Sequence, residues 1–66
     1  MGHKICADIV YSPDNGGWYY ALYDFNGRDV GKDTGYPHPD ELSTETAARI
    51  AAADMGATIE KVSIVK

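Results

Sequence analysis

Acidic side chains around a short predicted hairpin are the first residues that could do chemistry. Asp24 and Asp29 flank Asn26-Gly27, a dipeptide that favours a two-residue type I′ turn. Such a turn sets the two carboxylates opposite each other, where like charges need a cation or solvent between them. Carboxylate oxygens are the ligands that Ca²⁺ and Mg²⁺ prefer, but the spacing matches no known calcium loop. We therefore predict two hydrated carboxylates and no metal ligand.

A second candidate lies in the loop Tyr36–Glu41, where His38 stands between two prolines and is followed by two carboxylates. These are donor types of a transition-metal site, yet no second His or Cys lies close in the sequence. As a general base His38 would need a nucleophile, and no motif places Ser43 or Thr34 beside it. We predict no catalytic residue, no enzyme activity and no cofactor. The alternative function is a small-molecule or metal-binding domain built from this loop and the two hairpin carboxylates.

The charge of the chain argues against nucleic acid as a partner. Ten acidic and six basic side chains give a net charge of −4, and the basic residues are scattered. Binding to a phosphate backbone depends on clustered Lys and Arg. The glycines form neither of the common phosphate-binding patterns. Exposed strand aromatics can stack on bases, but the acidic balance opposes that use.

Length and cysteine content predict one small acidic domain over residues 1–66 that depends on a partner. A chain of 66 residues buries only about 60% of its unfolded surface, and such domains usually need a disulfide, a metal or a second subunit. Cys6 is the only cysteine, which fits a reducing compartment and a buried thiol. We find no signal-peptide pattern and no apolar run near the length of a membrane span. We expect a cytoplasmic protein without membrane contact, and either a homodimer or a protein partner.

Hydrophobic periodicity predicts an α+β fold in the order β-β-β-α-β. Alternating residues predict strands over 4–11 and 58–65. Aromatic content predicts a strand over 18–25, and the Asn26-Gly27 turn predicts a short return strand over 28–32, so the first three strands form an antiparallel meander. The Ala-rich run Thr44–Met55 predicts one helix, with Ser43 as its N-cap and Gly56 just beyond its end. On the helix we expect Ala47, Ala48, Ala51 and Met55 to be buried, and these small side chains let the helix approach the sheet at Gly31. On the final strand we expect Val62 and Ile64 to be buried. We expect the final strand to lie beside the first.

The predicted registers give the sheet two apolar faces. One hairpin pairs Tyr11 with Trp18, and the other pairs Tyr23 with Val30 and Phe25 with Arg28. The better core face carries Ile5, Ala7, Ile9, Tyr11, Trp18, Tyr20 and Leu22. The second face carries Cys6, Val10, Tyr19, Ala21, Tyr23, Phe25 and Val30, and is interrupted by Asp8, which we expect at a rim or beside Lys4 or Lys32. One helix can cover only one of these faces.

The uncovered face predicts an interaction surface. A large exposed apolar patch usually marks an interface, and Tyr and Phe are residues that interfaces favour. We predict partner binding through Val10, Tyr19, Tyr23, Phe25 and Val30, by self-association or by inhibition of a protein partner. The alternative interpretation is that tyrosine on a hydrated sheet face is simply good strand material.

The stretch Asp14-Asn15-Gly16-Gly17-Trp18-Tyr19-Tyr20-Ala21, followed by an acidic helix start and the Ala-rich helix at Glu45–Met55, resembles a HicB-like antitoxin domain. Over residues 5–56 the succession of a strand, an acidic-Gly-Gly-aromatic turn, a second strand and a short helix is similar to that of the family. The resemblance implies a small bacterial or phage protein that acts by binding another macromolecule, for example by neutralising a toxin. It adds no catalytic residue.

Overall fold

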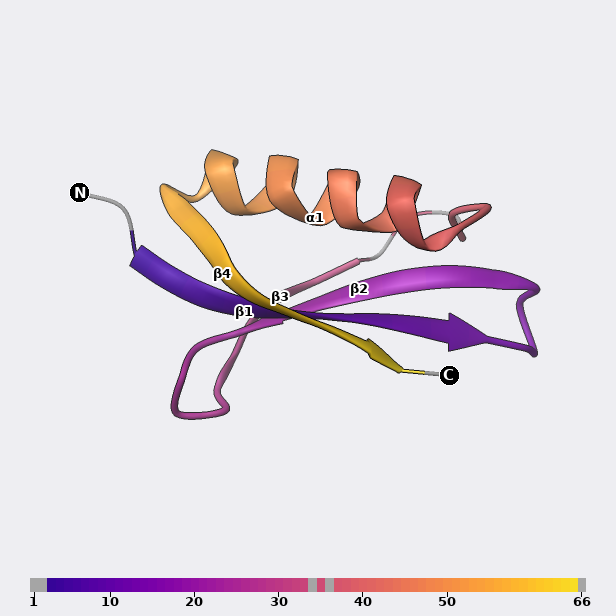
Figure 1. Ribbon diagram of the computed structural model, residues 1–66, viewed down its shortest axis with the longest axis horizontal. Helices are drawn as coiled ribbons and strands as arrows, with labels where there is room; N and C mark the ends of the chain where they lie inside the picture. Colours follow the sequence, from indigo (N-terminus) through magenta and orange to yellow (C-terminus); the bar gives the residue numbers. More distant parts are fainter. Residues whose placement is uncertain (1–2, 34, 36, 66) are drawn as a thin grey trace.

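The computed structural model describes residues 3–33, 35 and 37–65 as a four-stranded sheet with one helix (Figure 1). The strands are β1 (His3–Ser12), β2 (Gly17–Tyr23), β3 (Asp29–Lys32) and β4 (Ala57–Val65), and the helix α1 (Glu41–Asp54) precedes β4. The strand order is β3-β2-β1-β4. The predicted α+β class is confirmed, and β4 does lie beside β1. The sheet is mixed rather than antiparallel, because the crossover through α1 returns β4 parallel to β1.

The core lies between α1 and the face of the sheet that the first hairpin was predicted to present. Tyr11 pairs with Trp18 and Ile9 with Tyr20, as predicted, so the odd-numbered residues of β1 point toward the helix. The buried apolar residues are Ile5, Ala7, Ile9 and Leu22 from β1 and β2, Ala48 and Ala52 from α1, and Ala57 and Ile59 from β4. Because the helix contributes mainly alanine, its backbone packs close to the sheet. Figure 1 shows α1 on one side of the sheet only.

The helix begins earlier than predicted, and its buried stripe overlaps the predicted one only in part. Asp40, not Ser43, is the N-cap, and its Oδ1 accepts the backbone N–H of Ser43 at 2.7 Å. The buried helix residues are Thr44, Ala48 and Ala52, whereas the predicted Ala47 and Ala51 are only partly buried and Met55 is 44% exposed. The prediction for Ala48 is confirmed, since it is fully buried, and Ala51 packs against the core. The prediction for Met55 was wrong, because this residue is the C-cap, where the helix ends.

The helix end itself was predicted correctly. Gly56 follows the C-cap with a φ of 75°, the left-handed conformation that suits glycine. A Cβ built on Gly31 would lie 3.3 Å from Cε of Met55, so the helix end does approach β3 at this glycine, as expected. No helix in the described part of the chain is long and apolar enough to cross a membrane.

The second hairpin has a three-residue turn instead of the predicted type I′ turn. Asp24 accepts the N–H of Gly27 at 3.0 Å and donates its own N–H to the carbonyl of Arg28 at 2.9 Å. Only Gly27 has positive φ, at 83°, which fits a type I turn followed by a left-handed residue. The cause is Asp24, whose Oδ1 accepts the N–H groups of both Asn26 and Arg28 at 2.9 Å.

This turn shifts the pairing of β3 by one position at the start of the strand only. Asp29 pairs with Tyr23 and Gly31 with Leu22, and the register shift between these pairs leaves Val30 as an extra residue. The predicted pairs of Asp24 with Asp29, Tyr23 with Val30 and Phe25 with Arg28 are therefore wrong. A one-residue slip exchanges the faces of the side chains, so Asp29 and Val30 change face. The bulge restores the predicted register at Leu22 with Gly31 and Ala21 with Lys32.

The last strand also carries a register shift. Ile5 pairs with Ile59 but Cys6 pairs with Lys61, so Glu60 is the extra residue of a bulge. Ala57 and Ile59 are the buried residues of β4. The prediction that Ile64 points into the core was wrong in its degree of burial, since it is 44% exposed. Ile64 is exposed because β4 has a neighbouring strand, β1, on one side only and forms the edge of the sheet on the other.

Candidate functional site

The face of the sheet opposite α1 is the first candidate site, and we call it the open face. Its apolar part consists of Val10, Tyr19, Ala21, Tyr23 and Val65, as their pairing places them on the side away from Ile9 and Leu22. Val65 is 43% exposed, and the other four are partly buried by their neighbours. In Figure 1 no element covers this side, and the β2–β3 turn bends toward it. The predicted surplus apolar face is therefore present, although smaller than the prediction.

A hydrogen bond between Tyr23 and Asp8 organises the centre of the open face. The Tyr23 hydroxyl donates to Oδ1 of Asp8 at 2.9 Å. This bond, together with partial burial, raises the pKa of Tyr23 above its ordinary value, because the carboxylate favours the protonated hydroxyl. Asp8 was expected at a rim or beside Lys4 or Lys32, but its partner is this tyrosine. The acidic interruption of the patch is thus tied to the aromatic surface that it interrupts.

Cys6 lies on the same side of β1 and is nevertheless buried, at 3% exposure. It pairs directly with Tyr23 on β2 and with Lys61 on β4, so both neighbouring side chains flank the sulfur. The prediction of a buried thiol is confirmed. The open face consequently offers no accessible thiol among the described residues.

Two of the five predicted partner-binding residues lie elsewhere. Phe25 follows β2 in the turn and is 60% exposed, so it flanks the open face without belonging to it. Val30, shifted by the register change, lines a hollow with Ile5, Met55 and Ala57 on the helix side. Val10, Tyr19 and Tyr23 are on the open face as predicted. The missed signal was the ability of Asp24 to bond two backbone N–H groups of its own turn.

Charged residues border the open face in equal numbers of each sign. Asp29 and Lys32 on β3 pair with Tyr23 and Ala21, and Lys61 on β4 pairs with Cys6. Together with Asp8 they make two acids and two bases, so the net charge of −4 resides on the rest of the chain. Asp29, Gly27 and Asp8 also wall a shallow depression of about 470 Å³ whose floor includes Tyr23. The surface can therefore accept a neutral, partly apolar partner surface without net repulsion.

The second candidate is a pair formed by Asp33 and His38. Nε2 of His38 lies 2.7 Å from Oδ2 of Asp33, and the Asp33 side chain is only 7% exposed. The other oxygen of that carboxylate accepts the N–H of Gly35 at 3.0 Å. The His38 ring stacks on Tyr20 with centroids 6.4 Å apart. Burial and the Asp33 charge raise the pKa of Tyr20, since both disfavour a phenolate.

Backbone bonds fix this pair to the start of β2. The N–H of His38 donates to the carbonyl of Trp18 at 2.9 Å, and the N–H of Trp18 donates to the carbonyl of His38 at 3.0 Å. The N–H of Asp33 donates to the carbonyl of Tyr20 at 3.1 Å. Asp33 and His38 are thus both held on β2 by backbone bonds, and the carboxylate orients the imidazole.

The structure does not assemble the alternative site that combined this loop with the hairpin carboxylates. His38 sits at the start of β2, whereas Asp24 follows the other end of this strand and Asp29 pairs with its last residue, Tyr23. Asp40 is committed to the helix cap, and the Ser43 N–H that it accepts lowers the pKa of its carboxyl. Tyr36 and Thr34 lie outside the described residues. Within the described ranges, no three His, Cys, Asp or Glu side chains are grouped closely enough to hold a metal ion.

Sequence reasoning missed the role of Asp33, which it noted only as a neighbour of the hairpin. The only signal was its separation of five residues from His38, across a segment with glycine and proline. Such a separation has no fixed meaning in a loop. The burial of the carboxylate arises from the packing of the loop on Tyr20, which the sequence does not reveal.

Comparison of the chain with protein-family models, with curated proteins and with solved structures finds no match in any of the three. The two sites described above are therefore the features on which a function can be argued.

Proposed function

We propose that the protein is a non-enzymatic protein-interaction module whose contact surface is the open face of its sheet. It would act by self-association or by binding and inhibiting a protein partner. The observation that carries the proposal is the uncovered set of Val10, Tyr19, Tyr23 and Val65 on a sheet whose other face holds the buried core cluster beneath α1. Apolar and aromatic side chains gathered on one face are what protein interfaces use.

The balanced charge of the open face favours a protein surface over a polyanion. Asp8 at its centre and Asp29 at its border would repel phosphate, and the basic Lys32 and Lys61 stand on opposite edges of the sheet. Nucleic-acid binders instead cluster their basic residues. A second sheet stacked about 10 Å away, as in a β-sandwich, would cover the aromatic rings and leave the charged borders at the rim.

The HicB-like resemblance fits the same proposal. A domain of that kind would present the aromatic strand that follows the turn at Asp14–Gly17 to a bound protein. The hydrogen bond from Tyr23 to Asp8 supports this use, because it holds a large ring in one orientation and so lowers the entropy lost on binding. The small-molecule or metal-binding alternative has no comparable support, as its residues lie at opposite ends of β2.

The mass of the protein in solution tests the proposal. We expect wild type to sediment above its 7.2 kDa monomer mass, and we expect Tyr19→Lys to shift the mass toward monomer by placing a charge in the apolar patch. Leu42→Lys is the matched control, because Leu42 is 74% exposed on α1 and away from the open face. An equal response of both variants would contradict a role for the open face. A monomeric wild type would exclude its use for self-association and leave binding to a different protein.

A further inference from the structure

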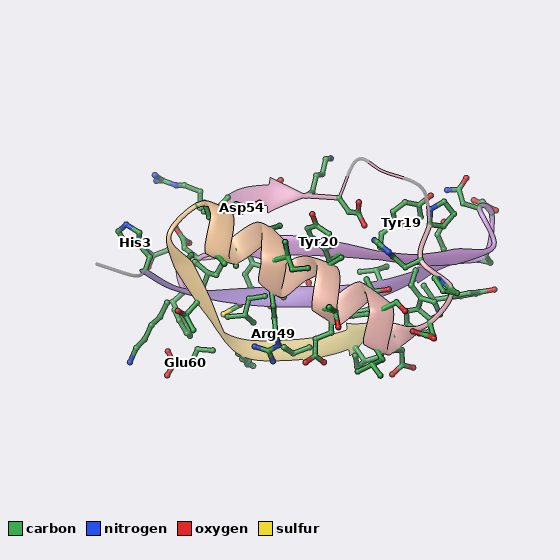
Figure 2. The ribbon with its side chains drawn as sticks, turned by 90° about the horizontal axis from the view of Figure 1, so that it is seen from above. His3, Tyr19, Tyr20, Arg49, Asp54 and Glu60 are labelled. Atoms are coloured by element: carbon green, nitrogen blue, oxygen red, sulfur yellow. The ribbon has the colours of Figure 1, made fainter. Side chains whose placement is uncertain are left out.

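The outer edge of β4 is a second unpaired surface, independent of the open face. β4 has nine residues and pairs only with β1 in the described part of the chain. The opposite edge, β3, has four residues. A long edge strand presents a row of backbone N–H and C=O groups that can pair with another chain. In Figure 2, which looks down on α1, the labelled Glu60 lies along this edge and the helix does not enclose it.

The middle of β4 carries opposite charges side by side at its bulge. Glu60 is the extra residue and Lys61 follows it, and both are exposed. Within the chain Glu60 only approaches Lys4, with Oε2 4.0 Å from Nζ and both side chains at least half exposed. An exposed pair at that distance contributes little. Both charges at the bulge are thus available to an oncoming strand.

We propose that β4 pairs antiparallel with β4 of a second copy, across a two-fold axis that passes through the Glu60–Lys61 bulge. Glu60 then meets Lys61 of the second copy, and the reverse contact follows from symmetry. Ile59 lies opposite Val62 of the second copy, and Thr58 opposite its Ser63. The two four-stranded sheets become one continuous sheet, with both helices on the same face.

The bulge is what makes this register consistent. Direct partners in an antiparallel pair must point to the same face of the sheet. Ile59 and Val62 are both on the helix side, since they pair with Ile5 and Ala7 of β1, and Ser63 pairs with Asp8 on the open face. In a regular strand, residues three apart point to opposite faces. The extra residue at Glu60 removes that conflict, so a strand with opposite charges at its bulge becomes complementary to itself.

The same register covers exposed apolar surface. Ile64, 44% exposed at the edge, comes to lie opposite Ala57 of the second copy, also on the helix side. The two open faces become continuous across the new strand pair. The edge contact therefore goes beyond the open-face proposal, because it joins two such faces into one broader surface.

Cysteine cross-linking tests the register directly. Partners in an antiparallel pair have Cα atoms about 4.5–5.5 Å apart, within the range of a disulfide. We expect a mixture of Thr58→Cys and Ser63→Cys proteins to give cross-linked dimers under mild oxidation, while either variant alone stays monomeric on a non-reducing gel. Each variant alone is the control, because like positions lie several residues apart across the axis. Labelling with a thiol reagent verifies that both new thiols are reactive. No dimer in the mixture, or equal dimer from a single variant, would overturn the proposal.

Charge reversal provides a second test by sedimentation. Lys61→Glu or Glu60→Lys alone sets like charges opposite each other twice, and we expect each to raise the dimer Kd about tenfold. The double variant exchanges the signs and should return within about twofold of wild type. Lys32→Glu makes the same charge change on the other edge and should have no effect. A monomeric wild type, or a double variant as weak as the single ones, would overturn the edge contact.

The two interfaces fail separately. If Tyr19→Lys dissociates the protein and Lys61→Glu does not, the open face forms the contact and the edge pairing is wrong. If only the β4 variants dissociate it, the edge pairing stands and the open face has no role in self-association.

Discussion

Tyr23 and Asp8, which lie on neighbouring strands, are joined by a hydrogen bond of 2.9 Å on the open face of the sheet. The two residues are diagonal neighbours and not direct partners, since Tyr23 pairs with Cys6 and Asp8 pairs with Ala21. It satisfies a carboxylate in the middle of an apolar patch, and it holds the Tyr23 ring beside the buried Cys6. Asp8, which interrupts the apolar patch, therefore also fixes the orientation of the Tyr23 ring within it.

Tyr23→Phe removes this bond and should lower the free energy of unfolding by about 0.5–1.5 kcal/mol. In the wild type the pKa of the Tyr23 hydroxyl is raised, chiefly by the bond to Asp8. The bond therefore contributes fully below the ordinary tyrosine pKa, and its contribution is lost as the pH rises through the raised value. Urea unfolding should show a constant difference from wild type between neutral pH and about pH 9, and a smaller one above. Tyr19→Phe, which removes a hydroxyl from the same face, should change stability less.

Gly27→Val should destabilise the protein by about 1–3 kcal/mol. Gly27 has a φ of 83°, and a Cβ there would meet nothing within 4 Å. The cost is therefore backbone strain rather than a clash. We expect the same cost for the three-residue turn as for the type I′ turn, because Gly27 is in the left-handed conformation in both. Asn26→Val in the same turn is a useful comparison, since Asn26 does not have positive φ. Equal melting temperatures for wild type and the Gly27 variant would contradict the assigned turn.

The first hairpin shows how far the sequence predicts this fold. Residues 4–11 alternate, and residues 18–25 are rich in aromatic residues that favour strands. The pairing of Tyr11 with Trp18 then fixes all the remaining pairs of the two strands, as observed. The second hairpin could not be predicted in this way. Turns of two and of three residues fit the same Asn26-Gly27 dipeptide, and they differ by one residue in register. The choice between them depends on Asp24, whose carboxylate bonds two N–H groups in the folded turn.

The residues of the candidate sites were predictable on regular strands, but not at a bulge or in a loop. Val10, Tyr19 and Tyr23 were predictable because they lie on regular strands, where period-two alternation decides the face. Val30 was not, because a bulge moves it to the helix side. The Asp33–His38 pair lies in a loop that has no periodicity. Its contact depends on how that loop packs on Tyr20 and Trp18, so only the folded structure reveals it.

Ala48→Leu should destabilise the protein by about 1–3 kcal/mol, because it overpacks the contact between α1 and the sheet. Ala48 is fully buried, at 0% exposure. Ala53→Leu is the matched control, since Ala53 is exposed on the same helix and should change stability little. Urea denaturation of both variants would check this. The opposite ranking would contradict the observed buried stripe of Thr44, Ala48 and Ala52.

The Asp33–His38 contact should show measurable coupling in a double-mutant cycle. The contact is 2.7 Å long and its carboxylate is nearly buried, so the interaction should be worth about 1 kcal/mol. The cycle compares Asp33→Ala, His38→Ala and the double variant by urea unfolding. Arg49 and Glu45 on α1, 2.9 Å apart but exposed, offer a control pair with weaker coupling. Additive effects of the Asp33 and His38 changes would show that the pair does not fasten the loop.

Asp40→Ala should lower stability at neutral pH by removing the cap of α1. The Asp40 carboxylate accepts the Ser43 N–H at 2.7 Å, and this bond holds the pKa of Asp40 below its ordinary value. A lowered pKa means that the stabilisation is fully present above the ordinary carboxyl range and is lost as the pH falls through the folded value. Melting temperatures of wild type and Asp40→Ala should therefore differ at neutral pH and converge toward about pH 2. Asp40→Asn keeps an oxygen acceptor and should stay close to wild type at neutral pH. Ser43→Ala is the comparison, because it keeps the backbone N–H, which lowers the pKa of Asp40 most, and removes only the smaller contribution of the Ser43 hydroxyl. A larger loss for Ser43→Ala than for Asp40→Ala would return the cap to Ser43, where the sequence alone first placed it.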